Sequence, residues 1–319
     1  MSDESNNRGR AYEYICLRSL ESEIRKIRKV QIEKNSSFEA AERAWNLIDK
    51  DLQNILKLSA LTAVGNLFEF EPLITEADED IVTLLIQPDR KGEEGDVRDI
   101  LIIRSGIKWE IGLSIKHNHF AVKHSRLSPT IDFGKKWYNK SCSSEYWKTV
   151  LPIFDFLEQC RGKGIAWHDM ADKDEKVYIP LLKAFKKEIE NSYEQDKSIP
   201  RKLIEYLLGN YDFYKVISID SKQMTQIQTY NLHGTLNKSA KKNKPKKIIP
   251  SVVLPTRIVS FDFKPSSTNT VELYLDEGWQ FSFRIHNAST IVEPSLKFDI
   301  QIIGMPTTII TINSYWLNV

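Results

Sequence analysis

The sequence has few cysteines and no long apolar stretch. Its three cysteines, Cys16, Cys142 and Cys160, lie far apart, as is typical of reduced intracellular thiols rather than of a disulfide framework. The chain contains no run of about 18 apolar residues and no apolar segment near its N-terminus. The sequence therefore predicts neither a membrane span nor a secretory signal, and we expect a cytoplasmic protein.

The chain also lacks a strong net charge. Its 45 basic and 43 acidic side chains give +2 over 319 residues, so any nucleic-acid surface must be local. Six lysines crowd into residues 238–247. Such a run is a solvated loop in most proteins, but in a DNA enzyme it can follow the phosphate backbone, and both interpretations stay open.

A predicted β-hairpin brings an acid and a lysine together. Residues 99–104 and 109–116 are rich in Ile, Leu and Trp, and a short turn joins them. If the turn centres on Gly106 and Ile107, antiparallel pairing places Asp99 opposite Ser114. Alternation then puts Lys116 on the same face, while the opposite face is apolar.

This pair of side chains suits phosphodiester hydrolysis. Mg²⁺ held by a carboxylate supplies Lewis acidity and lowers the pKa of the attacking water, and a lysine adds positive charge and positions that water. Taken singly, an Asp at a strand edge and a Lys at a strand end are ordinary surface residues. Because the hairpin register places them together, we predict that Asp99 binds metal and Lys116 positions the water.

Five segments carry motifs in a specific order and spacing: residues 7–13, 95–99, 109–119, 122–128 and 278–298. Together they resemble the PD-(D/E)XK nuclease superfamily and, more narrowly, the HaeIII family of type II restriction endonucleases. The resemblance implies an α/β (α+β) fold with a PD-(D/E)XK core. It also implies Mg²⁺-dependent cleavage of double-stranded DNA at GGCC, between the central G and C. A cognate DNA cytosine methyltransferase would protect the DNA of the bacterial host.

The chain departs from the superfamily motif at Ser114, where an acid usually precedes the lysine by two residues. Ser114 would line the site, and a second acid must come from elsewhere. Glu110 faces the same way as Lys116 but lies about 20 Å away along the strand. Glu13 shares the apolar stripe of a predicted helix, and superfamily members often carry an acid there, although it could simply complement the helix N-terminus. Asp96 is a third possibility.

A basic segment follows the catalytic strand. It holds three of the six histidines, but no Cys pair lies at ligand spacing, so zinc is not indicated. Asn118 is instead a candidate N-cap for a helix whose N–H groups face a phosphate, the alternative being a solvated basic face. The predicted DNA contacts here are His117, Asn118, His119, Lys123, His124 and Arg126.

A second hairpin is predicted near the C-terminus. Apolar and polar residues alternate over 271–275 and 279–286, with a turn at Glu277 and Gly278. Its polar face carries the side-chain types that read base edges in the major groove, although any half-buried hairpin has a polar face. The predicted DNA contacts on this hairpin are Arg284, His286, Asn287 and Ser289.

The wider pattern predicts an α/β core with helical insertions and no internal repeat. Helices are expected at 11–34, 38–58, 144–157, 176–189 and 199–208, and a strand at 81–86. We expect a nuclease core with helical insertions over 1–235. A lysine-rich linker or DNA-contacting loop would span 236–250, and a β-rich region for DNA recognition 251–319.

Two other functions remain compatible with the sequence. A structure- or damage-specific repair or recombination nuclease could use the same core without a protecting methyltransferase. A catalytically inactive DNA-binding protein is the second alternative, because Ser114 replaces the usual acid. Cleavage of both strands at a palindrome would make a homodimer a reasonable expectation.

Overall fold

The computed structural model describes residues 2–88, 95–120 and 122–316. The chain divides into two compact units. The first comprises Met1–Phe120, Asn210–Val253 and Thr307–Val319, and the second comprises Ala121–Gly209 and Leu254–Pro306. This division differs from the expected boundaries at residues 235 and 250, because the predicted helical insertions group with the C-terminal β-rich segment and the lysine-rich segment belongs to the first unit.

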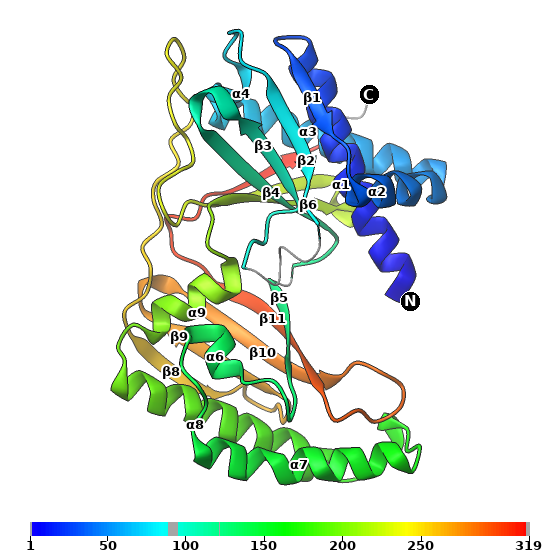
Figure 1. Ribbon diagram of the computed structural model, residues 1–319, viewed down its shortest axis with the longest axis vertical. Coiled ribbons are helices and arrows are strands. Elements are labelled where there is room, and N and C mark those ends of the chain that lie inside the picture. The colour runs from blue at the N-terminus through cyan, green and yellow to red at the C-terminus, as the bar shows by residue number, and fades with distance from the viewer. Residues whose placement is uncertain (1, 89–94, 121, 317–319) are drawn as a thin grey trace. The chain divides into compact units, whose positions relative to one another are not determined.

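A seven-stranded mixed sheet forms the centre of the first unit, in the order β1-β2-β3-β4-β6-β7-β12. The pairs β1–β2 and β4–β6 are parallel, and the other pairs are antiparallel. Helices α1 and α3 pack against these strands, and α2 packs along α1 (Figure 1). The elements are α1 Ser2–Arg25, β1 Val30–Glu33, α2 Ser36–Leu47, α3 Lys50–Phe70, α4 Pro72–Thr75, β2 Val82–Ile86, β3 Ile100–Arg104, η1 Ser105–Ile107, β4 Trp109–His117, β6 Phe213–Ile219, η4 Asp220–Lys222, β7 Met224–Tyr230 and β12 Thr311–Tyr315.

Two expected helices have other bounds than the sequence pattern predicted. The helix over 11–34 was wrong at its end, because α1 stops at Arg25 and residues 30–33 form β1, parallel to β2. The helix over 38–58 was wrong as a single element. Asp49 begins a new helix by accepting a hydrogen bond from the N–H of Leu52 at 2.8 Å, so α2 and α3 are separate. The strand expected at 81–86 is confirmed as β2.

The apolar core of the first unit lies between its helices and the sheet. Leu17, Leu20 and Ile24 of α1 are fully buried in one cluster with Ile102 of β3 and Ile111 of β4. This stripe is the one that the sequence predicted for the first helix. It therefore fixes the rotation of α1 about its axis relative to the sheet.

A five-stranded antiparallel sheet forms the centre of the second unit, in the order β5-β11-β10-β9-β8. Phe185 of α8 packs among aromatic side chains that include Phe133, Trp137, Phe283 and Phe298. The elements are β5 Lys123–Leu127, α6 Phe133–Tyr138, α7 Ser144–Gly162, η2 Trp167–Asp169, η3 Asp174–Tyr178, α8 Ile179–Gln195, α9 Ile199–Leu208, β8 Ile258–Phe263, β9 Thr270–Leu275, η5 Asp276–Gly278, β10 Gln280–Asn287 and β11 Leu296–Gly304.

The predicted C-terminal hairpin is confirmed. Strands β9 and β10 pair antiparallel, with Phe283 opposite Val271. The turn contains Glu277 and Gly278 with φ of 59° and 86°. Helices α7, α8 and α9 also match the helical spacing of the sequence. In the second unit, alternation therefore identified the hairpin and helical periodicity identified these three helices.

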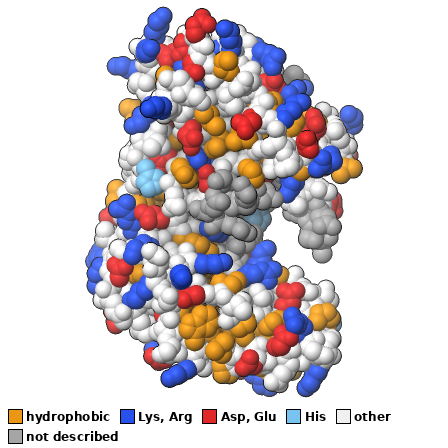
Figure 2. Space-filling view, viewed as in Figure 1, with side chains coloured by type: hydrophobic (Ala, Val, Ile, Leu, Met, Phe, Trp, Pro, Cys, Tyr) orange, Lys and Arg blue, Asp and Glu red, His pale blue; other side chains and the backbone are white. Residues whose placement is uncertain are grey.

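The surface carries charges of both signs. On the face shown in Figure 2, basic and acidic side chains are interspersed rather than separated into large areas of one sign. None of the helices in the described part of the chain combines the length and the apolar character needed to cross a membrane.

A buried acid joins α3 to the sheet of the first unit. Glu71 is fully buried, and its Oε1 accepts hydrogen bonds from Tyr214 Oη at 2.5 Å and from the N–H of Asn237 at 2.6 Å. Its Oε2 has no hydrogen-bond partner among the described residues. Burial raises the pKa of Glu71 to about 7, although the hydrogen bonds oppose the shift.

This raised pKa predicts a loss of stability as the pH rises. The unfolded carboxyl releases its proton near pH 4.5 and the folded one near pH 7, so the folded state binds more protons in between. Stability should fall across that window and level off above it. Replacing Glu71 by Gln removes the ionisation. Between acid and neutral pH, the free energy of unfolding of Glu71→Gln should therefore rise relative to that of the wild type by up to about 3 kcal/mol.

Urea unfolding over that pH range measures the difference. Glu69→Gln is the control. Lys247 lowers the pKa of the neighbouring Glu69, so ionisation of Glu69 should change the stability with pH in the opposite direction. Parallel pH profiles for Glu71→Gln and the wild type would contradict the prediction.

Candidate active site

The candidate site lies where β3 and β4 separate. Ile102 pairs with Ile111 and Ile100 with Leu113, so the register confirms the predicted placement of Asp99 opposite Ser114. Asp99 still donates its N–H to Leu113 O at 2.7 Å, but β3 begins only at Ile100. Beyond this point β4 has no strand partner on that side in the described register.

The carboxylate of Asp99 occupies this separation. Its Oδ2 accepts the N–H of Ile115 at 2.6 Å, and so takes the place of a strand carbonyl. The same oxygen accepts from Lys116 Nζ at 3.0 Å and from Ser114 Oγ at 3.4 Å. The side chains of Asp99 and Lys116 are 25% and 28% exposed, so the pair is fixed but reachable. The structure thus brings three of the predicted site residues together.

The charge state of Lys116 follows from its neighbours. Burial alone would lower the pKa of Lys116, but the charge and hydrogen bond of Asp99, with a further contribution from Glu13, outweigh it and raise the pKa. Lys116 is therefore held as an ammonium. In this state it can orient a water molecule and offset negative charge.

Glu13 reaches this site from α1. The residue is half-buried on the helix whose apolar stripe packs on the sheet. Its carboxylate lies close enough to Lys116 to raise the pKa of that lysine. Of the three acids considered as partners for Asp99, Glu13 has this electrostatic link to the Asp99–Lys116 pair.

The other two acids are engaged by Arg98. Asp96 accepts bonds from Arg98 Nε at 2.8 Å and Nη2 at 2.7 Å, while Glu110 accepts from Nη1 at 2.9 Å. The guanidinium also stacks 4.0 Å above the ring of Tyr211. Asp96 and Glu110 therefore hold Arg98 in place, and Arg98 holds the segment that leads into Asp99.

The donor set fits a hard divalent cation. Among the described residues, the three hydrogen bonds to the Asp99 side chain all end on Oδ2. The other oxygen, Oδ1, is therefore available to bind a metal ion. No group of three or more His, Cys, Asp or Glu suited to a metal occurs within the described ranges. Mg²⁺ needs no such cage, because it keeps several waters and binds through one or two carboxylates. Asp99 and Glu13 would supply those carboxylates.

The segment after β4 differs from the expectation. The helix predicted to begin at Asn118 was wrong, because the chain bends there with φ of 50° and continues into β5, which pairs with β11. His117 Nε2 contacts Asp220 Oδ2 at 2.6 Å, and Asn118 bonds to the same oxygen at 3.0 Å. Both side chains tie the end of β4 to η4, while His119 is exposed.

Strand β5 carries the next predicted DNA contacts within the second unit. Lys123 Nζ donates to Tyr206 O at 2.8 Å and lies over the Tyr206 ring, and burial lowers its pKa to about 8. Arg126 bonds to Ser295 and approaches Glu293 at 3.7 Å, with its side chain 41% exposed. The side chain of His124 lies outside the described residues.

The polar face of β10 holds the remaining candidates. Arg284 contacts Asp299 at 3.1 Å and stays 57% exposed. His286 bonds through Nδ1 to the carbonyl of Asn287 at 2.9 Å. The Asn287 amide bonds to the carbonyls of Ser289 and Ile291 and so shapes its own loop, while the Ser289 side chain is exposed.

One residue at the site was missed by the sequence interpretation. Lys215 lies at the centre of β6, in register with Ser114, and is 5% exposed. Burial, followed by the charge of Lys116, lowers the pKa of Lys215 to about 7, against an opposing effect of Asp99. The available signal was a single lysine within the apolar run 213–219.

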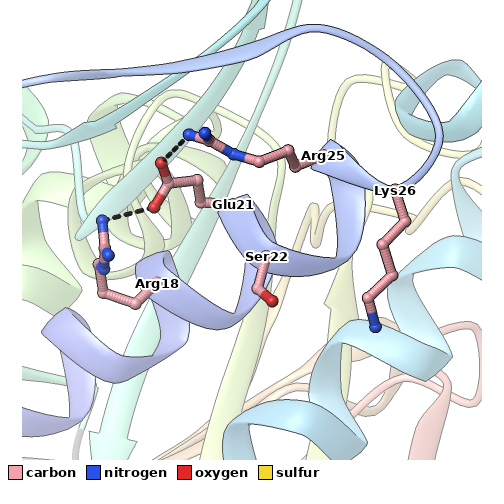
Figure 3. A pocket seen from close by; sticks show the side chains of 5 residues that line it. All are labelled: Arg18, Glu21, Ser22, Arg25 and Lys26. Carbon is pink, nitrogen blue, oxygen red and sulfur yellow. Dashed lines mark hydrogen bonds and ion pairs between the residues drawn. The ribbon is translucent and has the colours of Figure 1, made fainter.

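A surface pocket of about 370 Å³ lies elsewhere, along the exposed side of α1 (Figure 3). Glu21 bonds to both Arg18 and Arg25 at 2.5 Å and offsets part of their charge. The pocket contains none of the predicted site residues.

Gly112 makes room for Arg98. A Cβ at Gly112 would overlap the aliphatic stem of Arg98, within 2.7 Å of its Cβ. Gly112→Ala should therefore displace Arg98 from Asp96 and Glu110 and destabilise the protein by about 1–3 kcal/mol. Denaturant unfolding measures the change.

Gly65→Ala provides the matched control. Gly65 lies in α3 with open space around its Cβ position, so alanine should stabilise that helix by about 0.5–1 kcal/mol. Equal stabilities for the two variants would show that Gly112 has no such packing role.

Comparisons with known proteins identify the family of the chain. Residues 9–306 match the sequence model of the family described as HaeIII restriction endonuclease. The chain is 52% identical over 318 residues to the type II restriction enzyme HaeIII of Haemophilus aegyptius, which covers 99% of each chain. No solved structure gives a significant match. The resemblance inferred from the motifs is confirmed, and the chain belongs to the HaeIII restriction endonuclease family.

Proposed function

We propose that this protein is a type II restriction endonuclease that hydrolyses both strands of DNA with Mg²⁺ at GGCC, between the central G and C. Membership of the HaeIII family supports the restriction activity and the target. One structural observation carries the chemistry. The carboxylate of Asp99 and the ammonium of Lys116 lie 3.0 Å apart where two strands separate, and both are accessible.

Asp99 and Glu13 are proposed as the protein's metal ligands. Bound Mg²⁺ would supply Lewis acidity to the phosphodiester and lower the pKa of a bound water. Oδ1 of Asp99 is the proposed ligand atom, because Oδ2 accepts the three hydrogen bonds that fix the carboxylate. The charge of Glu13 reaches the same centre through its effect on Lys116.

Lys116 and Ser114 are proposed to prepare the site for reaction. Because its pKa is raised, Lys116 donates protons in hydrogen bonds, and it can hold the attacking water and offset charge on the phosphoryl oxygens. Ser114 supports the orientation of Asp99 through its hydroxyl. An acid at position 114 is then unnecessary if Glu13 supplies the second carboxylate.

The first unit is proposed to be the PD-(D/E)XK catalytic core, and the second unit to carry much of the DNA recognition. The support for the core is a mixed sheet that separates at Asp99, with α1 packed against it. In the second unit, the support is the exposed guanidinium of Arg284, a group that can pair with guanine. Asn287 is proposed to shape the recognition loop, since its amide is bonded within it.

The remaining predicted contacts are retained as proposals of two kinds. Exposed side chains are proposed to touch DNA directly, and these are His119, Arg126 and Ser289, with His286 beside them. Bonded side chains are proposed to hold the backbone that approaches DNA, and these are His117, Asn118 and Lys123. His124 stays a prediction from the sequence.

The proposed partners follow from the family. A cognate DNA cytosine methyltransferase would protect the host sequence, and two copies of the chain would act at the two strands of a palindrome. The methyltransferase is implied by the family, and the pairing of two copies by cleavage of both strands. Methylation of GGCC in the substrate should therefore block cutting by the purified protein.

A cleavage assay tests the function. Unmethylated plasmid with Mg²⁺ should yield discrete fragments whose ends map to GGCC, and Lys116→Ala should cut about 10²–10⁴-fold more slowly. Lys148→Ala, on the exposed side of α7, should cut at the wild-type rate. Cutting confined to branched or damaged DNA would indicate a repair nuclease, and binding without cutting would indicate an inactive DNA-binding protein.

Single replacements of the acids test the metal ligands. Asp99→Asn and Glu13→Gln should each weaken Mg²⁺-dependent cutting and the binding of Mn²⁺ measured by calorimetry. Glu110→Gln should retain both, because Glu110 is 44% exposed and bonds to Arg98. Loss of Mn²⁺ binding in Glu110→Gln but not in Glu13→Gln would overturn this assignment.

A further inference from the structure

Lys215 is an unusual residue for the centre of a strand. It lies in β6 between fully buried neighbours, and only 5% of its surface is exposed. An amine in such surroundings is disfavoured in its charged form, as its pKa of about 7 reflects. A methionine of similar length would pack there without this desolvation penalty.

The sheet register places Lys215 beside the catalytic pair. Lys215 is the register partner of Ser114 across the parallel β4–β6 pair, and Lys116 lies two residues further along β4. Side chains of paired residues project to the same face, so all three share one side of the sheet. Lys215 also interacts electrostatically with both Lys116 and Asp99.

The ammonium reaches over the end of β4. Lys215 Nζ donates to Phe120 O at 2.9 Å, and the N–H of Asn118 donates to Ser218 O at 2.8 Å. Thus β6 holds the segment that leaves the catalytic strand. This hydrogen bond sets the position of the amine relative to the site.

Fastening the backbone does not by itself require a lysine. Any neutral donor of suitable reach could bond to Phe120 O without burying a charge beside Lys116. Lys123 makes a comparable bond to Tyr206 O, but its pKa is lowered by burial and not by a neighbouring charge of the site. The feature specific to Lys215 is its place beside the charges of the site.

We propose that Lys215 is a second cationic catalytic residue, whose ammonium contacts the scissile phosphate and offsets the negative charge that grows on it. The proposal rests on the proposed function of the site. The positive charges of Mg²⁺ and Lys116 offset those of Asp99, Glu13 and the phosphodiester before reaction. Lys215 would therefore act on the further negative charge that develops in the transition state. The incoming phosphate also favours the charged form of Lys215.

Lys215→Met tests this role with two readouts of opposite sign. Single-turnover cleavage of GGCC plasmid at saturating Mg²⁺ should slow by about 10–10³-fold, because a preorganised cation is lost. Binding of Mn²⁺ to the DNA-free protein should become several-fold tighter, because a like charge next to the metal ligands is removed. Lys148→Met, on the exposed side of α7, should leave both cleavage and Mn²⁺ affinity unchanged.

Further variants separate the alternatives. Lys215→Gln keeps a donor for Phe120 O but not the charge, and it should also cut slowly. Wild-type cutting by Lys215→Gln, or joint loss of cutting and Mn²⁺ affinity in Lys215→Met, would reduce Lys215 to a structural role. Unchanged cutting by Lys215→Met would overturn the proposal outright.

Controls keep this inference distinct from the proposed function. Thermal unfolding should show Lys215→Met at least as stable as the wild type, since a buried charge is removed. Wild-type protein that fails to cut GGCC, or Asp99→Asn that still cuts, would refute the proposed function itself. The Lys215 proposal alone would be refuted if the wild type cuts, Asp99→Asn is inactive and Lys215→Met is fully active.

Discussion

The site depends on how the backbone N–H of Ile115 is satisfied. Strand β3 begins at Ile100, so β4 extends past its partner, and an unpaired buried N–H would cost about 1–3 kcal/mol. The carboxylate of Asp99 accepts that N–H at 2.6 Å. Sheet pairing thereby fixes the carboxylate at the separation of the strands. The nearby placement of Lys116 and Ser114 follows from β4 alone.

The acids around this point divide by their partners. Arg98 forms ion pairs with the buried Asp96 and with Glu110, and Gly112 leaves the space in which the aliphatic part of Arg98 lies. Asp99 and Glu13 instead act on Lys116 and raise its pKa. Arg98 therefore engages Asp96 and Glu110 in a structural role, and Asp99 and Glu13 are left as the acids proposed to bind a cation. If Glu13 supplies the second carboxylate, as we propose, a serine can stand at position 114.

Local patterns predicted much of this arrangement. The turn at Gly106 and Ile107 fixed the Asp99–Ser114 register, because a hairpin closes within a few residues, and the stripe of α1 placed Glu13 on the inner side. The helix expected at Asn118 failed because β5 is held by β11, far along the chain. The sequence did not indicate Lys215 as a site residue, for a related reason. Its place beside Ser114 depends on parallel pairing of β4 with β6, across about 100 residues of intervening chain that no local pattern encodes.

We propose that the metal binds where β3 and β4 separate. The position of Mn²⁺ in crystals of the protein, located by anomalous scattering, tests this proposal. We expect Mn²⁺ bound to Asp99 and faced by Glu13, with Arg98 still holding Asp96 and Glu110. Mn²⁺ bound by Asp96 or Glu110, with Arg98 displaced, would contradict it.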